Sequence, residues 1–220
     1  MSVLCRPQGS ASVETFRIEP LSVNPAPTPF LDENPLKIVI RNYLAASFLL
    51  EQEPQIWDAI VILDSGLMAT DFVATNARRH IYLRFDDVVA ATISKRPPTI
   101  SDIRKAMGFA TNSENLLVSC RAGQSRSVAI AFLIAFQQMG SAAALSLLNP
   151  KRHSPNSLIV RLGEQLVDDP LMWSMFNGWR ERHQGIRLSD YVDDIEREFD
   201  ELELLGAKNR IIHTRYRPES

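Results

Sequence analysis

From residue 36 onward the sequence alternates between short apolar runs and longer helical patterns, and this alternation constrains the fold more than any other feature. The apolar runs are rich in β-branched or aliphatic residues, as is typical of buried strands, and they cover residues 36–40, 58–63, 80–85 and 116–118. Helical spacing or a helix start occurs at residues 42–51, at Thr99, and at 126–139, 156–166, 171–183 and 189–205. Strands that alternate with helices predict an α/β domain with a central, mostly parallel sheet of about four strands flanked by helices. These patterns do not predict the order of the strands.

Changes in composition predict three segments. Five of the 13 prolines lie between residues 20 and 35, in a stretch without helical or strand periodicity. Residues 1–35 are therefore expected to form a proline-rich N-terminal arm. Residues 36–168 hold the alternating pattern, and residues 169–220 read as a helical C-terminal extension with a basic tail.

The last predicted helix has two unlike faces. Apolar residues recur at three- and four-residue steps, at Leu188, Val192, Ile195, Phe199 and Leu202. The opposite face is acidic, and residues 189–203 carry a net charge of −7. We expect the apolar stripe to pack within the chain and the acidic face to stay in solvent, because desolvating so many charges is unfavourable.

Composition and charge narrow the class of protein further. A net charge of −2 gives no general attraction to nucleic acid or to anionic membranes, so neither is an expected partner. The longest apolar run has nine residues and is too short to span a bilayer. Two cysteines, Cys5 and Cys120, are too few for a disulfide framework, and the histidines lack the spacing of metal ligands. These features predict a cytoplasmic protein with free thiols and no bound metal, and they leave the oligomeric state open.

The segment from Leu116 to Ser127 carries the chemistry. A strand runs into Cys120, the chain turns, and a helix starts at Arg126. The unpaired N–H groups and the dipole of a helix N-terminus favour an anion, so the thiolate form of Cys120 is stabilised near neutral pH. Gly123 lets the loop bend, and the guanidinium of Arg126 matches two phosphate oxygens. The segment predicts phosphoryl transfer to sulfur, with the phosphate held by Arg121, Ala122, Gly123, Gln124, Ser125 and Arg126.

This segment, S-C-R-A-G-Q-S-R-S, resembles the H-C-x-x-G-x-x-R-S/T signature of the cysteine-dependent protein tyrosine phosphatases, most closely the dual-specificity branch of bacterial type. Pro155-Asn156 with Gln165-Leu166 resembles a second motif that closes dual-specificity domains. The resemblance covers residues 36–167. It implies a phosphatase-like catalytic domain that hydrolyses phosphomonoesters, expected to be phosphorylated proteins, through a phosphocysteine intermediate and without a cofactor.

The resemblance also implies roles for single residues. Family phosphatases take a general acid from an aspartate about 30 residues before the cysteine. Asp87 lies 33 positions before Cys120 and fits the Phe-x-Asp pattern of related bacterial sequences. Asp86 is the alternative, and Asp64, after the preceding strand, is a weaker candidate. Ser127 matches the hydroxyl that helps the thiolate to leave.

One departure from the family pattern keeps other functions open. Ser119 stands where the family usually has histidine, so a phosphate-binding or interaction module with weak catalysis is an alternative. Rhodanese-like sulfur transfer also uses a cysteine loop before a helix, but its arginine commonly follows closer to the cysteine. In the loop itself, Arg121 and Gln124 are expected to face the rim of the site and to influence substrate choice.

Overall fold

The computed structural model describes residues 36–90, 92–183 and 192–213, which lie in one compact unit, Asn34–Ser220. Its centre is a sheet of four parallel strands in the order β1-β4-β2-β3. The strands are β1 (Lys37–Arg41), β2 (Asp58–Leu63), β3 (Arg79–Arg84) and β4 (Asn115–Ser119). Every strand lies within one or two residues of its predicted position, and the predicted α/β class with a parallel sheet is confirmed.

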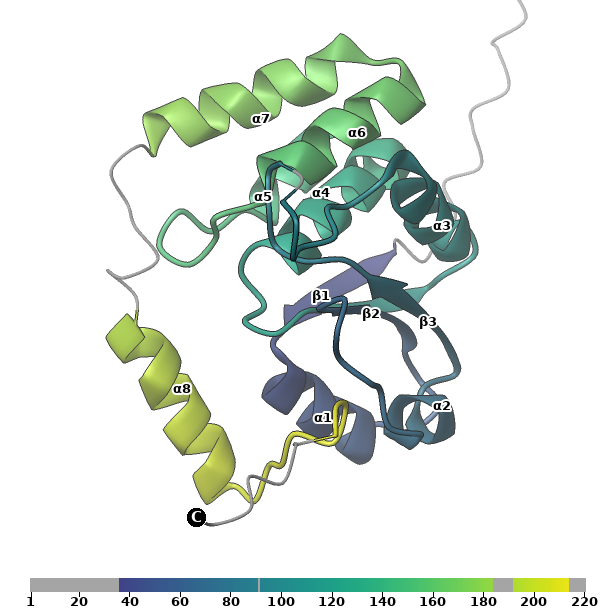
Figure 1. The fold of residues 1–220 in the computed structure, drawn as a ribbon, viewed down its shortest axis with the longest axis vertical. Coiled ribbons are helices and arrows are strands. Elements are labelled where there is room, and N and C mark those ends of the chain that lie inside the picture. Colours follow the sequence, from purple (N-terminus) through teal and green to yellow (C-terminus); the bar gives the residue numbers. More distant parts are fainter. Residues whose placement is uncertain (1–35, 91, 184–191, 214–220) are drawn as a thin grey trace, which may run out of the picture. The chain divides into compact units, whose positions relative to one another are not determined.

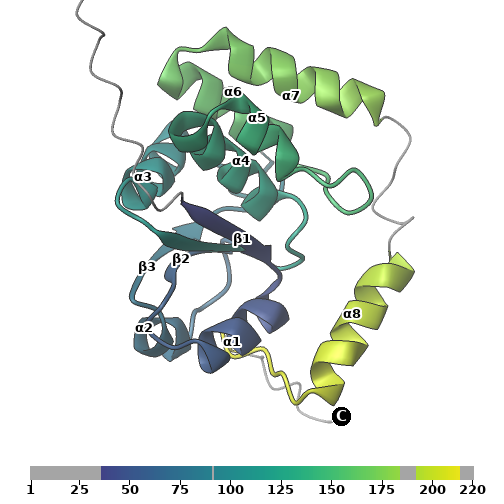
Figure 2. The same cartoon turned by 180° about the vertical axis from the view of Figure 1, so that it is seen from behind.

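Helices cover both faces of this sheet (Figures 1 and 2). One face carries α3 (Ile100–Ala110), α4 (Arg126–Met139), α5 (Ser141–Ser146), α6 (Ser157–Val167) and α7 (Pro170–Arg182). The other face carries α1 (Tyr43–Gln52) and α2 (Phe72–Asn76). The short helix α2 was not predicted, because five residues give too little periodicity to detect.

Alternation along the central strands divides the core between these two faces. In β2, Ile60 and Ile62 join the cluster around α4, whereas Ala59, Val61 and Leu63 join the cluster around α1. All six residues of β2 are buried, as expected for a strand covered by helices on both faces. The helix predicted at residues 126–139 is α4, and every residue of it from Arg126 to Phe136 is buried. This burial holds the start of α4 rigidly against the sheet.

Local capping explains where two of the helices begin. Thr99 caps α3 by accepting a hydrogen bond from the backbone N–H of Asp102, and Asp102 accepts one from the backbone N–H of Thr99. These two reciprocal bonds form a capping box, at the helix start that the sequence predicts. Asn42 caps α1 in a similar way, through a bond from the N–H of Ala45 at 2.8 Å.

The part of the C-terminal extension that begins with α8 lies on the face that carries α1 (Figure 2). Helix α8 (Val192–Leu204) contacts α1, and the segment after it continues to the loop before α2, where Ile212 forms an antiparallel bridge with Ala69. Within the predicted apolar stripe, Phe199 and Leu202 are half-buried, as packing within the chain requires. Leu188 and the side chains of residues 192 and 195 lie outside the described residues. Ile211, which the stripe did not include, is fully buried in the core beside α1.

Candidate active site

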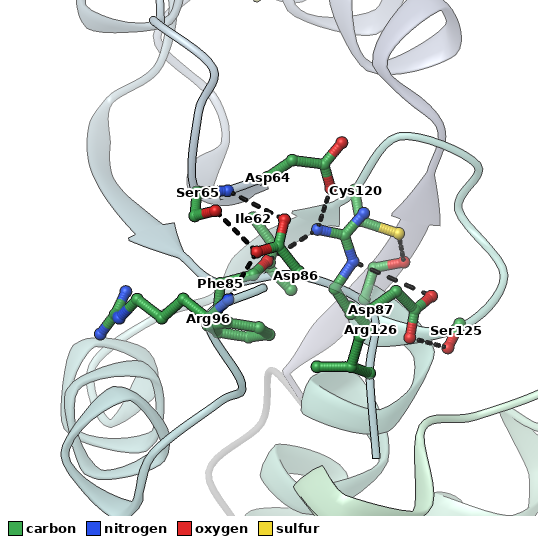
Figure 3. Close-up of polar contacts among 12 residues, drawn as sticks. Ile62, Asp64, Ser65, Phe85, Asp86, Asp87, Arg96, Cys120, Ser125 and Arg126 are labelled. Atoms are coloured by element: carbon green, nitrogen blue, oxygen red, sulfur yellow. Dashed lines mark hydrogen bonds and ion pairs between the residues drawn. The ribbon is translucent and has the colours of Figure 1, made fainter. Parts of the chain in front are cut away.

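The carboxyl ends of three neighbouring strands meet at the candidate site (Figure 3). Cys120 follows β4, Asp64 follows β2, and Asp86 and Asp87 lie just beyond β3. Open parallel sheets commonly bind ligands at this edge. Together with Arg126, these residues line a cavity of about 270 Å³. Among the described residues no group of His, Cys, Asp or Glu has the arrangement of a metal site.

Cys120 lies at the bottom of the loop that joins β4 to α4. The residue is buried, and its Sγ lies 3.1 Å from the Oγ of Ser127, in the first turn of α4. A hydroxyl at this distance can donate a hydrogen bond to a thiolate. The structure thus brings together the predicted nucleophile and the predicted hydroxyl.

Gly123 explains why the loop can lie so tightly over the sheet. Its φ is +69°, in the left-handed region that disfavours other residues. A Cβ atom here would lie 2.6 Å from the backbone N of Asn42 and 2.8 Å from the carbonyl carbon of Arg41. The loop therefore packs directly against the junction of β1 and α1, and this close approach requires glycine.

Arg126 is held by groups from two other strand ends. Its Nη1 lies 2.6 Å from Oδ1 of Asp64 and donates to the carbonyl oxygen of Phe85 at 2.9 Å. Burial would lower the pKa of this guanidinium, but the negative charges of Cys120, Asp64 and Asp87 outweigh burial and raise it. Arg126 is therefore a permanent cation beside the sulfur. The sequence presented Asp64 only as a weak acid candidate, because the contact with Arg126 depends on a strand order that the sequence does not reveal.

One nitrogen of the Arg126 guanidinium is not engaged by the protein groups that hold Nη1. Its Nε is buried and has no hydrogen-bond partner within the described part of the chain. Oδ2 of Asp87 lies 3.9 Å from that nitrogen. A buried N–H without a partner is unfavourable, so this nitrogen favours an anion in the cavity.

The two adjacent aspartates have unlike surroundings. Asp86 is only 4% exposed and accepts hydrogen bonds from the backbone N–H groups of Ser65 and Arg96 and from the Ser65 hydroxyl. Burial by itself would raise the pKa of Asp86, but these hydrogen bonds outweigh it and lower the pKa below its ordinary value. A carboxylate held in this way is a poor proton donor, so its role here is to join the loops after β2 and β3.

Asp87 points toward the loop and is accessible. Its side chain is 39% exposed, and its Oδ1 accepts hydrogen bonds of 2.8 Å from Ser125 Oγ and from Asn156 Nδ2. Asn156 also caps α6 and donates to the carbonyl oxygen of Val88. The Pro155-Asn156 motif therefore holds the segment that carries Asp87. Sequence reasoning noted this motif but missed its contact with the candidate acid.

Three side chains in or next to the loop differ in their exposure and hydrogen bonding: Gln124, Arg121 and Ser119. Gln124 does not face the rim: it is 1% exposed, because the turn at Gly123 directs the next side chain inward, and the expectation for Gln124 is wrong. Its backbone carbonyl accepts a hydrogen bond from the N–H of Ser154. Arg121 is exposed, as expected. Ser119, in the position of the family histidine, is buried, and its hydroxyl finds no hydrogen-bond partner among the described residues.

A buried thiol follows a parallel strand of the sheet, and a loop turned by glycine joins it to an arginine at the start of a buried helix. The chain is similar to solved structures of protein tyrosine phosphatase and dual-specificity type. One is the human tyrosine phosphatase-like serine/threonine/tyrosine-interacting protein, with 19% identity, a TM-score of 0.45, and coverage of 61% of this chain and 93% of that chain. Tk-PTP in its active form gives 14% identity, a TM-score of 0.43, and coverage of 60% and 90%.

PTPMT1 in complex with PI(5)P is a third similar structure, with 11% identity, a TM-score of 0.41, and coverage of 60% of this chain and 93% of that chain. No protein-family model matches the sequence, and no curated protein matches it. In the described part of the chain, no helix is long and apolar enough to cross a membrane.

Proposed function

We propose that this chain is a cysteine-dependent phosphatase that hydrolyses phosphomonoesters through a phosphocysteine intermediate. One observation carries the proposal: Cys120, Arg126 and the accessible carboxyl of Asp87 line one cavity at the start of a buried helix, and the Nε of Arg126 has no hydrogen-bond partner among the described residues. A phosphate group in this cavity would meet a nucleophile, a cation and a proton donor together.

In the first step the thiolate of Cys120 attacks phosphorus. The S–P bond forms as the P–O bond to the leaving group breaks, and the leaving oxygen takes a proton from Asp87. The N–H groups of the loop and the guanidinium of Arg126 stabilise the charge on the equatorial oxygens. Asp64 and the carbonyl of Phe85 support this by fixing Nη1, which orients the remaining guanidinium nitrogens.

In the second step water attacks the phosphocysteine. A new P–O bond forms, the S–P bond breaks, and the Asp87 carboxylate takes the proton that water loses. The Ser127 hydroxyl, 3.1 Å from the sulfur, donates a hydrogen bond to the departing thiolate. The products are inorganic phosphate and the dephosphorylated alcohol or phenol. We place the substrates among phosphorylated proteins, and a reducing cytoplasm suits a mechanism that needs a free thiol.

Hydrolysis of p-nitrophenyl phosphate tests the proposal. The wild-type chain should release p-nitrophenol, and Cys120→Ser should abolish release while vanadate should inhibit the wild type. Cys5→Ser is the matched control, because it removes the other thiol and should leave the rate unchanged. Equal rates for the wild type and Cys120→Ser would contradict the proposal.

A phosphate-binding module without turnover is the second candidate. The hydroxyl of Ser119 has no hydrogen-bond partner among the described residues, so this side chain does not support the loop around Cys120. This observation favours the second candidate. On this view the wild type binds phosphate or vanadate at the Arg126 cavity but does not release p-nitrophenol.

A further inference from the structure

A second and larger hollow adjoins the candidate active site. It has a volume of about 890 Å³ and lies between α1 and the C-terminal extension. We call it the extension groove. Its lining is Tyr43, Leu44, Leu67, Arg121, Phe199, Glu203, Ala207, Lys208, Asn209, Ile212 and His213.

The groove and the catalytic cavity share one lining residue, Arg121. This exposed loop residue, next to Cys120, lines both hollows. A ligand whose phosphate occupied the small cavity could therefore extend past Arg121 into the groove. The volume of the groove is in the range of sites that hold a drug-sized molecule or a few side chains.

The wall that the extension contributes is firmly attached. The N–H of Thr70 donates to the carbonyl of Ile211 at 2.9 Å, and the N–H of Arg210 donates to Ser47 Oγ at 3.0 Å. Arg210 also forms an ion pair of 3.1 Å with Glu51 on α1. Ile211 anchors the segment because its side chain is fully buried. A wall held at so many points is preorganised for binding, which reduces the entropy that a ligand must overcome.

Charge around the groove favours one kind of occupant. The lining itself is mostly apolar, with Leu44, Phe199 and Ile212 among its members, and its charged residues are two cations, Arg121 and Lys208, and one anion, Glu203. Beside it, α8 presents exposed acidic side chains at Glu196, Asp200 and Glu203. This rim attracts a basic segment and repels an anionic membrane surface.

We propose that the extension groove recognises the polypeptide next to the phosphorylated residue, with a large apolar side chain in the groove and a Lys or Arg beside Glu203. This rests on the proposed function, since the phosphate itself is placed in the Cys120 cavity. The groove is thus a specificity site that the C-terminal extension adds to the catalytic domain. In this proposal the apolar lining binds the large side chain, and the acidic residues of α8 bind the Lys or Arg.

Charge reversal on α8 tests the proposal. Glu203→Lys changes the groove, and Glu201→Lys makes the same change on an exposed residue of the same helix outside the lining. The substrates are a phosphotyrosine peptide with Leu and Arg flanks, the same peptide with Gly and Ser flanks, and p-nitrophenyl phosphate. We expect Glu203→Lys to lower the ratio of kcat/KM for the Leu/Arg peptide to that for p-nitrophenyl phosphate by roughly tenfold. Glu201→Lys should change this ratio by no more than about twofold, because Glu201 does not line the groove and exposed charges interact weakly in water.

Binding to the Cys120→Ser chain separates this inference from the proposed function. Fluorescence anisotropy should give a lower Kd for the Leu/Arg peptide than for the Gly/Ser peptide, and Glu203→Lys should remove the difference. If peptide binding depends on Glu203 but the wild type shows no turnover, the enzymatic proposal fails and the groove stands. If turnover is present but both charge reversals have equal effects, the groove proposal fails. Tight binding to vesicles of anionic lipid, with no preference between the peptides, would also overturn it.

Discussion

Replacing Gly123 with alanine should destabilise the fold and weaken phosphate binding, and the structure gives the size of the effect. A non-glycine residue in the left-handed region costs about 1–2 kcal/mol, and the φ of Gly123 is +69°. The added Cβ would also lie 2.6 Å from the backbone N of Asn42. Backbone cannot rotate away as a side chain can, so relieving the overlap costs a further ~1–3 kcal/mol. The total loss is about 2–5 kcal/mol, a large part of the stability of a typical domain.

Gly206→Ala separates the two contributions. Gly206 has a φ of +83°, but no heavy atom lies within 4 Å of where its Cβ would be. This variant should therefore lose only the conformational part, about 1–2 kcal/mol. Urea unfolding at 25 °C measures both free energies, and inhibition by vanadate reports on the loop. If Gly123→Ala is no less stable than Gly206→Ala and keeps its affinity for vanadate, the loop does not depend on its close approach to the β1–α1 junction.

Four further predictions concern other parts of the site and fold. Asp87→Asn should lower kcat on alkyl phosphates by about 10²–10⁴-fold and on aryl phosphates far less, because only a poor leaving group needs the proton. If Asp86→Asn showed this selective loss and Asp87→Asn did not, the general acid would be Asp86. Asp86→Asn should mainly lower the free energy of unfolding, by about 1–3 kcal/mol, because it weakens three buried hydrogen bonds. Burial and the charge of Arg152 lower the pKa of His153 to about 4. As the pH falls, the unfolded chain therefore protonates this histidine before the folded chain does, and the free energy of unfolding should decrease by about 1–3 kcal/mol between pH 7 and pH 4. Urea unfolding of the wild type and of His153→Gln should show a weaker pH dependence in the variant. Ile211→Ala should lower the free energy of unfolding by about 2–5 kcal/mol, and a Tm equal to that of the wild type would mean that the tail does not pack on α1.

Local features of the sequence determined the secondary structure and singled out the loop from Cys120 to Arg126. The apolar run of β2, the capping box at Thr99 and the uniformly apolar α4 each depend on neighbours a few residues away, so all three were predictable. The segment from Cys120 to Arg126 was recognisable for the same reason, because a strand, a glycine and a helix start are local signals. The roles of its residues remain predictions that the kinetic experiments test.

Only the tertiary structure decided which distant residues meet. Periodicity shows that a strand is buried but not which strand lies beside it, so the order β1-β4-β2-β3 could not be predicted. That order brings Asp64 to Arg126, and the packing of the loops buries Asp86 while it leaves Asp87 accessible. The inward turn of Gln124 has the same origin. Contacts of this kind join residues that are tens of positions apart, and their free energy depends on packing and desolvation that no local pattern encodes.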